Sequence, residues 1–519
     1  MIALMRISVL GFAVAAFRGD SGAPETLPDV LAQARAALGR DAAPRLDGSV
    51  RVEGRSRRNG LDAEYSLLFA GDGRFVLATG GRLATTVGFD GEAAWEVGPG
   101  GLARTLELGD REDALFAAWV PMGLWLEPAE SGRRFEVSRS PERDDEGSIA
   151  ISLKLRGGVK GLTLFLARDS HLPVALESTG VSGVERTTFA DFDRSAGFAF
   201  PRRIVRTSAG LSFESEARSI AKEKPGAPDP FARVAGSAAS ARFREGVSSR
   251  LESRRARTGH TLVRAEVAGT DVGWFIFDSG AGGMVIDRAA AEKAGLEAFG
   301  EVTAVGVGGP VKTRFRECRE FSIGPLVIEN VAFTELELGF LSAAFGVPIG
   351  GVCGYDVFGR AVVEFDAARE TIDLHDPARF DGAGLTFVEL FLGSKVPSVR
   401  CRFEGDREEI FRLDTGAGGS LAFHAPAVKR LGLLDGRETK QSVHGGVGGV
   451  IQARSGKLGW FEIGGRRFEP LEAQFSLAES GAFTDPYTAG NVGGDVLSRF
   501  RIVFDYPRKR IAFAPSAER

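Results

Sequence analysis

The chain has 519 residues, which predicts three or so domains at roughly 150 residues per domain. Hydrophobic residues make up 43% of it and charged residues 26%. These proportions exclude a disordered chain, a collagen and a polytopic membrane protein. The 65 basic and 69 acidic residues give a net charge of −4, and without a basic excess we expect no nucleic acid partner. Glycine is the unusual residue, because its 69 copies are nearly twice the ordinary share of about 7%.

Residues 1–24 are predicted to be a signal segment. Arg6 precedes an apolar run over residues 7–17, which is too short for a membrane-spanning helix of about 20 residues. A short apolar run after a positive charge is typical of a secretory signal, and Ala13-Val14-Ala15 offers a small-residue cleavage site. We therefore expect an exported protein, periplasmic or extracellular. The alternative is a terminus without function.

Residues 28–220 are predicted to form one β-rich domain. Leu31, Ala34 and Leu38 recur at helical spacing within residues 28–39. The segments that follow alternate apolar and polar side chains, as strands of an antiparallel sheet do. These segments are 48–54, 65–70, 74–79, 105–108, 148–155, 162–167, 173–178 and 202–207. Residues 221–247 are rich in Ala, Ser and Pro with mixed charges, which predicts a linker.

The rest of the chain is a tandem duplication. Four landmarks recur in the same order and at a nearly constant offset: Asp278-Ser279-Gly280-Ala281 with Asp414-Thr415-Gly416-Ala417, Gly306-Val307-Gly308-Gly309 with Gly446-Val447-Gly448-Gly449, Cys353-Gly354-Tyr355-Asp356-Val357 with Val492-Gly493-Gly494-Asp495-Val496, and Phe365-Asp366 with Phe504-Asp505. They predict two lobes, residues 250–377 and 384–516. Each lobe is expected to be mostly β, with one or two short helices and a hairpin at its end that turns near Asp366 or Asp505.

The first landmark carries the chemistry that we predict. An Asp directly after a buried strand is held rigidly, and the glycine two residues later permits a tight turn. If the two copies meet across a pseudo-two-fold axis, two carboxyls lie side by side and share one proton, because they cannot both ionise. One carboxyl then activates a water molecule while the other donates to a substrate carbonyl, as in the general case of aspartic proteases.

The predicted site therefore has Asp278 and Asp414 as the catalytic pair, braced by Ser279 and Thr415. Gly280 and Gly416 shape the two loops. This chemistry needs no metal and no cofactor. The five histidines form neither HExxH nor a pair at helical spacing, so we expect no zinc site. The three cysteines are sparse and odd in number, so they do not form a disulfide framework.

On these motifs the two copies resemble the bacterial retropepsin-like, pepsin-related aspartyl protease family, over about half the chain. The family's motif of two hydrophobic residues and a glycine occurs in full as Val352-Cys353-Gly354, but the second copy departs from it as Asn491-Val492-Gly493. The resemblance implies a β-barrel-like lobe for each copy, with the dyad at the lobe interface. It also implies two flaps that cover the substrate, and their glycines would be Gly306, Gly308, Gly309, Gly446, Gly448 and Gly449. Glycine suits a closing lid because it tolerates backbone changes.

The N-terminal region resembles the lipoprotein-carrier-like (LolA-type) domains of exported bacterial proteins. The resemblance rests on Phe89-Asp90-Gly91, His171-Leu172-Pro173 and the spacing from Gly197 to Pro201. It implies a curved sheet around an apolar cavity that holds a lipid or peptide tail. The alternative is a structural or docking domain.

The sequence therefore predicts an aspartic endopeptidase that acts on peptide or protein substrates. The alternative is a non-catalytic peptide- or lipid-binding envelope protein on the same scaffold. Pairing of each lobe with its twin in another chain stays open, as does the oligomeric state, although the short connection over residues 377–384 favours pairing within one chain. Ala281 and Ala417 provide no hydroxyl to the carboxylates, which predicts activity at weakly acidic or neutral pH.

Overall fold

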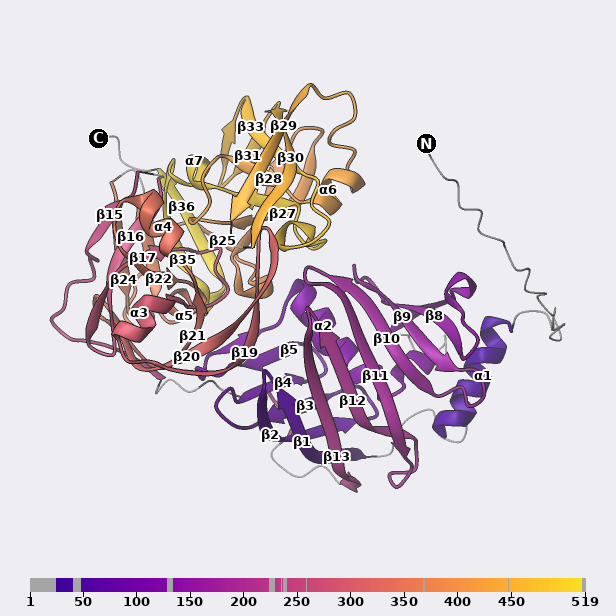
Figure 1. The fold of residues 1–519 in the computed structure, drawn as a ribbon. Helices are drawn as coiled ribbons and strands as arrows, with labels where there is room; N and C mark the ends of the chain where they lie inside the picture. Colours follow the sequence, from indigo (N-terminus) through magenta and orange to yellow (C-terminus); the bar gives the residue numbers. More distant parts are fainter. Residues whose placement is uncertain are drawn as a thin grey trace, which may run out of the picture.

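The computed structural model describes residues 25–40, 48–127, 134–223, 229–234, 236, 240–257, 259–366, 369–446 and 448–515. The predicted signal segment, residues 1–24, lies outside the described residues. The described chain is mainly β and forms four sheets, one in the N-terminal part and three in the duplicated part. Figure 1 shows the N-terminal sheet, in indigo to magenta, beside the two later lobes.

The N-terminal sheet is an antiparallel sheet of thirteen strands in the order β6-β5-β4-β3-β2-β1-β13-β12-β11-β10-β9-β8-β7. Its strands are β1 Ser49–Arg58, β2 Leu61–Ala70, β3 Phe75–Thr79, β4 Thr85–Phe89, β5 Ala94–Val97, β6 Ala103–Thr105, β7 Phe135–Arg139, β8 Ser148–Leu155, β9 Gly161–Ala167, β10 Pro173–Gly180, β11 Gly183–Asp193, β12 Phe200–Ser208 and β13 Leu211–Glu223. The prediction of an antiparallel sheet after one helix is thus confirmed.

Two helices pack on this sheet, α1 Leu27–Leu38 and α2 Leu108–Trp119. Thr26 caps α1 through its hydroxyl, but α2 begins without a side-chain cap, so the sequence carries no start signal for it. The prediction of a strand over residues 105–108 was wrong beyond Thr105, because β6 ends there and α2 begins at Leu108. Tertiary packing holds α2, because Trp119 lies against Phe89 near one end of the sheet and against Phe135 in the last strand at the other. The sheet curves around this helix.

The first lobe contains a nine-stranded sheet in the order β14-β21-β18-β22-β17-β16-β20-β19, with β15 paired to β16. Its elements are β14 Ala241–Phe243, β15 Ser253–Arg255, β16 Thr261–Val267, β17 Thr270–Phe277, β18 Val285–Asp287, α3 Arg288–Lys293, β19 Glu297–Gly306, β20 Gly309–Ile323, β21 Leu326–Leu336, α4 Gly339–Phe345, β22 Ile349–Cys353 and α5 Tyr355–Phe358. Strand β14 lies within the segment predicted to be a linker and pairs with β21 at the edge of the sheet. Composition does not reveal such a backbone pairing.

The second lobe repeats this arrangement in a sheet ordered β29-β30-β33-β28-β34-β27-β26-β31-β32. Its elements are β26 Ser398–Phe403, β27 Arg407–Leu413, β28 Leu421–Phe423, α6 Ala425–Arg430, β29 Thr439–Gly446, β30 Gly449–Leu458, β31 Phe461–Ile463, β32 Arg466–Phe468, β33 Leu471–Ser476, η6 Ala482–Thr484, β34 Gly490–Val492 and α7 Gly494–Leu497. The parallel pairs correspond in register, because Phe277 pairs with Cys353 in β17–β22 and Leu413 pairs with Val492 in β27–β34.

A five-stranded sheet, β24-β23-β35-β36-β25, joins the two lobes. Its elements are β23 Val362–Asp366, β24 Thr371–His375, β25 Phe387–Glu389, β35 Phe500–Asp505, η7 Tyr506–Arg508 and β36 Arg510–Pro515. The two predicted hairpins are present as β23–β24 and β35–β36. Their inner strands pair with each other, Val363 with Phe504, so the lobes of one chain are joined directly. This arrangement is the intramolecular pairing that the short connection favoured.

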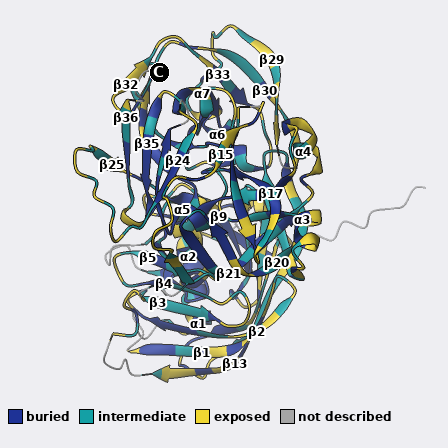
Figure 2. Cartoon of the chain, turned by 90° about the vertical axis from the view of Figure 1, so that its left-hand side faces the viewer, coloured by how far each residue is buried: buried dark blue, intermediate teal, exposed yellow. Residues whose placement is uncertain are grey.

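One apolar core runs through both lobes and the joining sheet. Phe358 in α5 packs against Phe277 and against Phe504, with ring centroids 4.8 and 5.6 Å apart. Figure 2 shows β35 and α5 largely buried and β29 largely exposed. No helix in the described part of the chain is long and apolar enough to span a bilayer. The core therefore fixes β17 and β27, the strands that lead into the repeated Asp motif.

Asp356 and Asp495 lie in the first turns of α5 and α7 but do not cap these helices. Gly354 occupies the capping position before α5, and Gly493 occupies it before α7. Each Asp is the second residue of its helix. There Asp356 pairs with Arg360, 3.1 Å away. Asp495 accepts a hydrogen bond from the Ser420 hydroxyl at 3.3 Å.

Candidate active site

The repeated Asp residues lie directly after equivalent strands. Asp278 follows β17 and donates its backbone N–H to the Cys353 carbonyl at 3.0 Å. Asp414 follows β27 and donates in the same way to Val492 at 3.1 Å. The parallel partner strand in each lobe thus fixes the backbone of its Asp. Both Asp residues are intermediate in exposure, so they are reachable from solvent.

The dyad loops approach so closely that only glycine fits two residues after each Asp. A Cβ at Gly280 would lie 2.6 Å from the carboxyl carbon of Asp414, and a Cβ at Gly416 would overlap the Asp278 carboxyl. Each carboxyl also accepts a backbone hydrogen bond within its own loop, from Gly280 to Asp278 at 2.7 Å and from Gly416 to Asp414 at 3.1 Å. The structure thus brings together the two Asp residues and the two glycines that the sequence singled out.

Ser279 and Thr415 link the two loops through four hydrogen bonds across the lobe interface. The Thr415 hydroxyl accepts from the Ser279 backbone N–H at 2.9 Å and donates to the Phe277 carbonyl at 3.0 Å. The Ser279 hydroxyl accepts from the Thr415 backbone N–H at 3.1 Å and donates to the Leu413 carbonyl at 2.8 Å. Ser279 is 1% exposed and Thr415 is 8% exposed. The loops are therefore locked to each other by buried, reciprocal contacts.

The two carboxyls form a hydrogen-bonded pair with perturbed acidity. Burial raises the pKa of Asp278 to about 8, with a further contribution from the negative charge of Asp414. Burial also raises the pKa of Asp414. Two carboxyls in contact ionise in two coupled steps, and the pair holds one proton between those steps. In that state one carboxyl is a base and the other is an acid.

The glycine-rich strings form the tips of two hairpins, β19–β20 and β29–β30. The first closes with Gly306 opposite Gly309 and the second with Gly446 opposite Gly449. The tips touch, because a Cβ at Gly308 would overlap the backbone of Gly448. All six predicted flap glycines therefore lie at or beside the hairpin turns. Val447, between the second pair, lies outside the described residues.

The second lobe contains a buried polar network next to Asp414 that the sequence did not predict. Asn491 donates its side-chain N–H to Asp414 Oδ2 at 3.1 Å, and His424 Nε2 lies 2.9 Å from Asn491 Oδ1. His424 is fully buried, and burial lowers its pKa to about 4, with the Arg412 charge acting in the same direction. The available signal was the departure of Asn491 from the hydrophobic pattern of the first copy.

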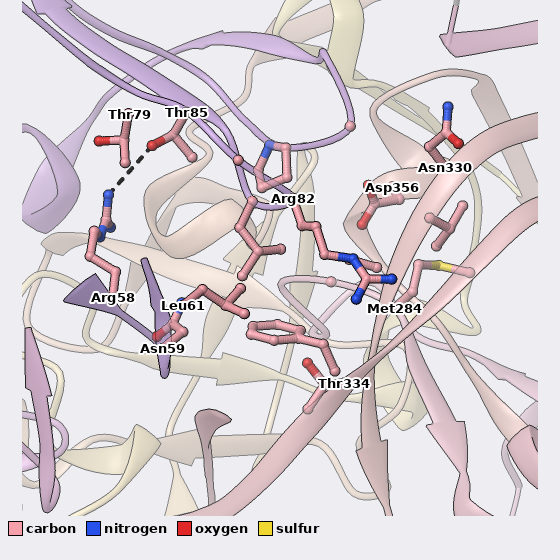
Figure 3. A pocket seen from close by; sticks show the side chains of 18 of the residues that line it. Arg58, Asn59, Leu61, Thr79, Arg82, Thr85, Met284, Asn330, Thr334 and Asp356 are labelled. Carbon is pink, nitrogen blue, oxygen red and sulfur yellow. Dashed lines mark hydrogen bonds between the residues drawn. The ribbon is translucent and has the colours of Figure 1, made fainter. Parts of the chain in front are cut away.

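The N-terminal sheet reaches the surroundings of the dyad. A cavity of about 250 Å³ lies where this sheet meets the first lobe (Figure 3). Gly282 and Gly283, which closely follow Asp278 in sequence, line it from the dyad loop, and Arg58 and Arg82 line it from the N-terminal sheet. Figure 3 shows the Arg82 side chain near Met284 and Asp356.

Hairpin ends of the N-terminal sheet also contact the flap strand β20, its neighbour β19 and the segment before η6. Three hydrogen bonds make these contacts: Lys312 Nζ to the Gly210 carbonyl at 2.9 Å, Glu301 N–H to the Asn59 carbonyl at 2.7 Å, and Gly481 N–H to the Val181 carbonyl at 2.8 Å. Arg82 adds ion pairs to Glu297, at 3.4 Å, and to Glu317. The N-terminal sheet thus supports the strands that carry the first flap.

A comparison with protein families gives one match. The model of a family described as aspartyl protease matches residues 263–357, which include Asp278, the first flap and the Val352-Cys353-Gly354 motif. The resemblance to aspartyl proteases predicted from the repeated motif is thereby confirmed. The match covers the first lobe, and the second lobe repeats the same topology. No curated protein matches the chain.

Solved structures resemble the two parts of the chain separately. A LolA superfamily protein from Nitrosomonas europaea is 16% identical, with 38% of this chain and 94% of that chain covered and a TM-score of 0.29. A DUF1329 family protein from Desulfovibrio piger is 11% identical, with 38% and 91% covered and a TM-score of 0.27. A retropepsin-like aspartic protease from Rickettsia conorii is 17% identical, with 25% and 89% covered and a TM-score of 0.20.

Proposed function

We propose that the protein is an aspartic endopeptidase that hydrolyses peptide bonds with a water molecule activated between Asp278 and Asp414. One observation carries this proposal: two carboxyls from equivalent strand ends of two lobes lie in hydrogen-bond contact, held by reciprocal Ser279 and Thr415 bonds. The partial exposure of both Asp residues and the two glycine-tipped hairpins whose tips touch are consistent with a site that admits an extended peptide.

The reaction follows from the single proton of the pair. The ionised carboxyl takes a proton from water, whose oxygen bonds to the peptide carbonyl carbon, while the protonated carboxyl gives its proton to the carbonyl oxygen. The resulting gem-diol returns one hydroxyl proton to the carboxyl that was protonated at the start. The carboxyl that was ionised at the start gives the proton that it took from water to the amide nitrogen, and the C–N bond breaks. A carboxylic acid and an amine leave, and the dyad regains its starting state.

The test compares the wild type with Asp278→Asn and Asp414→Asn on a peptide library. Each variant should lose at least about 100-fold in kcat/KM, because general acid–base catalysis contributes roughly 10²–10⁴-fold. The exposed Asp495 in α7 provides the matched control, and Asp495→Asn should cleave at the wild-type rate. Cleavage by either dyad variant as fast as the wild type would overturn the one-chain dyad.

The second candidate is a peptide- or lipid-binding protein on the same scaffold. A wild type that cleaves no peptide but retains peptide binding would favour it. Export, and an apolar ligand in the N-terminal region, stay predictions. Secretion of a full-length fusion to a reporter tests export, because a reporter that is active only outside the cytoplasm should be active.

The raised pKa of the dyad carboxyls predicts activity at weakly acidic to neutral pH. Burial is the main cause of the rise for both Asp278 and Asp414, and Ala281 and Ala417 add no hydroxyl donor. Because one carboxyl must stay protonated and the other ionised, higher pKa values move the active window upwards. A pH–rate profile measured from pH 3 to 9 checks this. A maximum at about pH 3, between the two values of about 1.5 and 4.7 known for pepsin, would contradict it.

A further inference from the structure

The two lobes differ in the strands beneath the dyad. In the first lobe the parallel pair β17–β22 places Ile276 opposite Val352, within an apolar cluster. In the second lobe the equivalent pair β27–β34 places Arg412 opposite Asn491. Burying polar groups is costly compared with apolar packing unless the groups are well paired. Since the first lobe forms the same fold with apolar residues, folding alone does not account for the polar pair.

Asn491 gives Asp414 a hydrogen bond that Asp278 lacks. Its Nδ2 donates to Asp414 Oδ2 at 3.1 Å, and Val352, at the equivalent position of the first lobe, has no donor. A hydrogen bond to the charged form of a carboxyl favours that form. The positive charge of Arg412 acts on Asp414 in the same direction. The dyad is therefore electrostatically asymmetric although its backbone is nearly two-fold symmetric.

His424 holds the Asn491 amide in the orientation that this bond requires, with the one proton of its neutral imidazole on Nε2. Its Nε2 lies 2.9 Å from Asn491 Oδ1, so the amide oxygen faces the imidazole and the amide NH₂ faces Asp414. Its Nδ1 lies 3.1 Å from the Thr488 hydroxyl, and that hydroxyl lies 2.6 Å from Asp485 Oδ2. Asp485 in turn accepts from Arg412 at 2.8 Å. The network thus closes on the strand that carries Asp414.

We infer that Asn491 is a positioning residue that assigns the two roles of the dyad. It favours the carboxylate of Asp414, so that Asp278 holds the shared proton in the resting protein. Asp414 then accepts the proton of the attacking water and Asp278 donates to the carbonyl oxygen. This inference rests on the proposed function for its catalytic meaning, but the proton distribution itself can be measured without catalysis.

Several titratable or charged groups act on the dyad from the elements around it. Arg412 in β27 and His444 in the flap strand β29 influence Asp414, and Tyr506 in η7 lies near Asp278. His424, which precedes α6, acts through Asn491. Replacing Asn491 leaves these groups in place, so a change of pH dependence reports the lost amide.

The test is Asn491→Val, which gives the second lobe the residue that the first lobe has. Loss of the donor should raise the pKa of Asp414, and the acidic limb of the kcat/KM profile should move up by about one pH unit. We expect kcat to fall about 10-fold with little change in KM, because the effect is on proton transfer and not on binding. A profile with both limbs at their wild-type pH and an unchanged kcat would overturn the inference.

A stability titration tests the same point without activity. An Asp whose pKa is raised in the folded state costs stability as pH rises above its unfolded value. Asn491→Val should therefore be destabilised relative to wild type by a greater amount at pH 8 than at pH 4. An equal difference in Tm at both pH values would mean a purely structural role and would overturn the inference. If the wild type cleaves no peptide, the proposed function fails while this measurement still decides the asymmetry.

The exchange variant Asn491→Val with Val352→Asn moves the amide to the first lobe. Because Val352 and Asn491 occupy equivalent register positions, the amide should then favour the carboxylate of Asp278. We expect the acidic limb to return towards its wild-type position. An exchange variant that folds, as judged by near-ultraviolet circular dichroism, but keeps the shifted limb of Asn491→Val would contradict the assignment.

Discussion

Ser279 and Thr415 show how single side chains decide the geometry of the dyad. Each hydroxyl accepts a backbone N–H from the opposite loop and donates to a carbonyl at the end of the opposite strand. The two residues are buried, so the backbone groups that they pair with have no access to water as a substitute. A hydroxyl at each position is therefore a structural requirement, which both Ser and Thr meet.

Thr415→Val tests this requirement with almost no change of shape. It leaves the Ser279 N–H and the Phe277 carbonyl without their partner, and each buried unsatisfied group costs about 1–3 kcal/mol. We expect the free energy of unfolding to fall by at least about 2 kcal/mol, measured by denaturant titration. Thr188→Val is the control, because that exposed hydroxyl makes only a 3.4 Å bond, and it should change stability little. Equal stability of the two variants would contradict the role of the hydroxyl.

The pKa of Asp278 predicts a pH-dependent stability effect. Its folded value of about 8 lies above the unfolded value of about 3.9, so the folded state keeps a proton that the unfolded state has lost. Stability therefore falls as pH rises from about 4 to 8. Asp278→Asn cannot ionise, and its Tm relative to wild type should rise by several degrees, at about 2–4 °C per kcal/mol, between these pH values. A Tm difference that does not change with pH would contradict the raised pKa.

Among the larger elements, the two predicted flaps touch each other at their hairpin turns. The β19–β20 and β29–β30 tips approach so closely that Gly308 has no room for a side chain, whereas Gly445 in the second flap does. Strand pairing runs without a register shift from Val302 to the turn in the first hairpin and from Thr439 to the turn in the second. The restriction therefore comes from the opposite flap and not from the hairpin itself.

Gly308→Ala and Gly445→Ala form a matched pair for the flaps. The first places a methyl group against the Gly448 backbone and should prevent the tips from meeting. We expect kcat/KM to fall about 10-fold, because lid closure completes many active sites, while Tm stays near the wild-type value. The second meets only Val450 Cγ2, 3.9 Å away, and should behave like wild type. Similar activity of both variants would show that tip contact is not needed.

Across the molecule as a whole, the N-terminal sheet and the lobes meet around Glu107. This residue precedes α2, and its carboxylate accepts a hydrogen bond from the Leu392 N–H at 2.9 Å and pairs with Lys509. Nearby, Asp110 accepts from the Ser394 N–H at 2.9 Å. Ser394 lies in η5 Gly393–Lys395, whose backbone would clash with a side chain at Gly282 of the dyad loop. The N-terminal part thus holds a loop that packs on the dyad.

Glu107→Ala tests this junction. The Leu392 N–H and the Lys509 ammonium lose their partner, which should destabilise the protein by roughly 1–3 kcal/mol. We expect calorimetry of the variant to show two separate unfolding transitions, the first at a lower temperature than in the wild type. The reason is that the Glu107 carboxylate bridges the N-terminal part and the lobes and stabilises neither part alone. Glu92→Ala removes an exposed hairpin carboxyl and serves as the control. A Glu107→Ala transition that matches the wild type would show that the junction is not coupled through this residue.

Short segments of the sequence encode the local features of this protein. The repeated Asp motif, its glycines and the alternating strands could all be predicted, because turn chemistry and periodicity act directly within such segments. Residue type at a single position also carried information: Asn491 at a hydrophobic position of the repeat indicated that the second lobe differs from the first.

Which of these segments contact each other depends on the tertiary structure, which local sequence patterns do not encode. Helix α2 has no capping signal and exists because Trp119 packs between two distant strands. The pairing of β23 with β35 joins the lobes within one chain, and the contact of Asn491 with Asp414 depends on the register of β27 and β34. Such contacts connect residues far apart in the chain, where local periodicity has no influence. Burial, which raises the pKa of both Asp residues, is likewise a property of the assembled lobes and not of the motif.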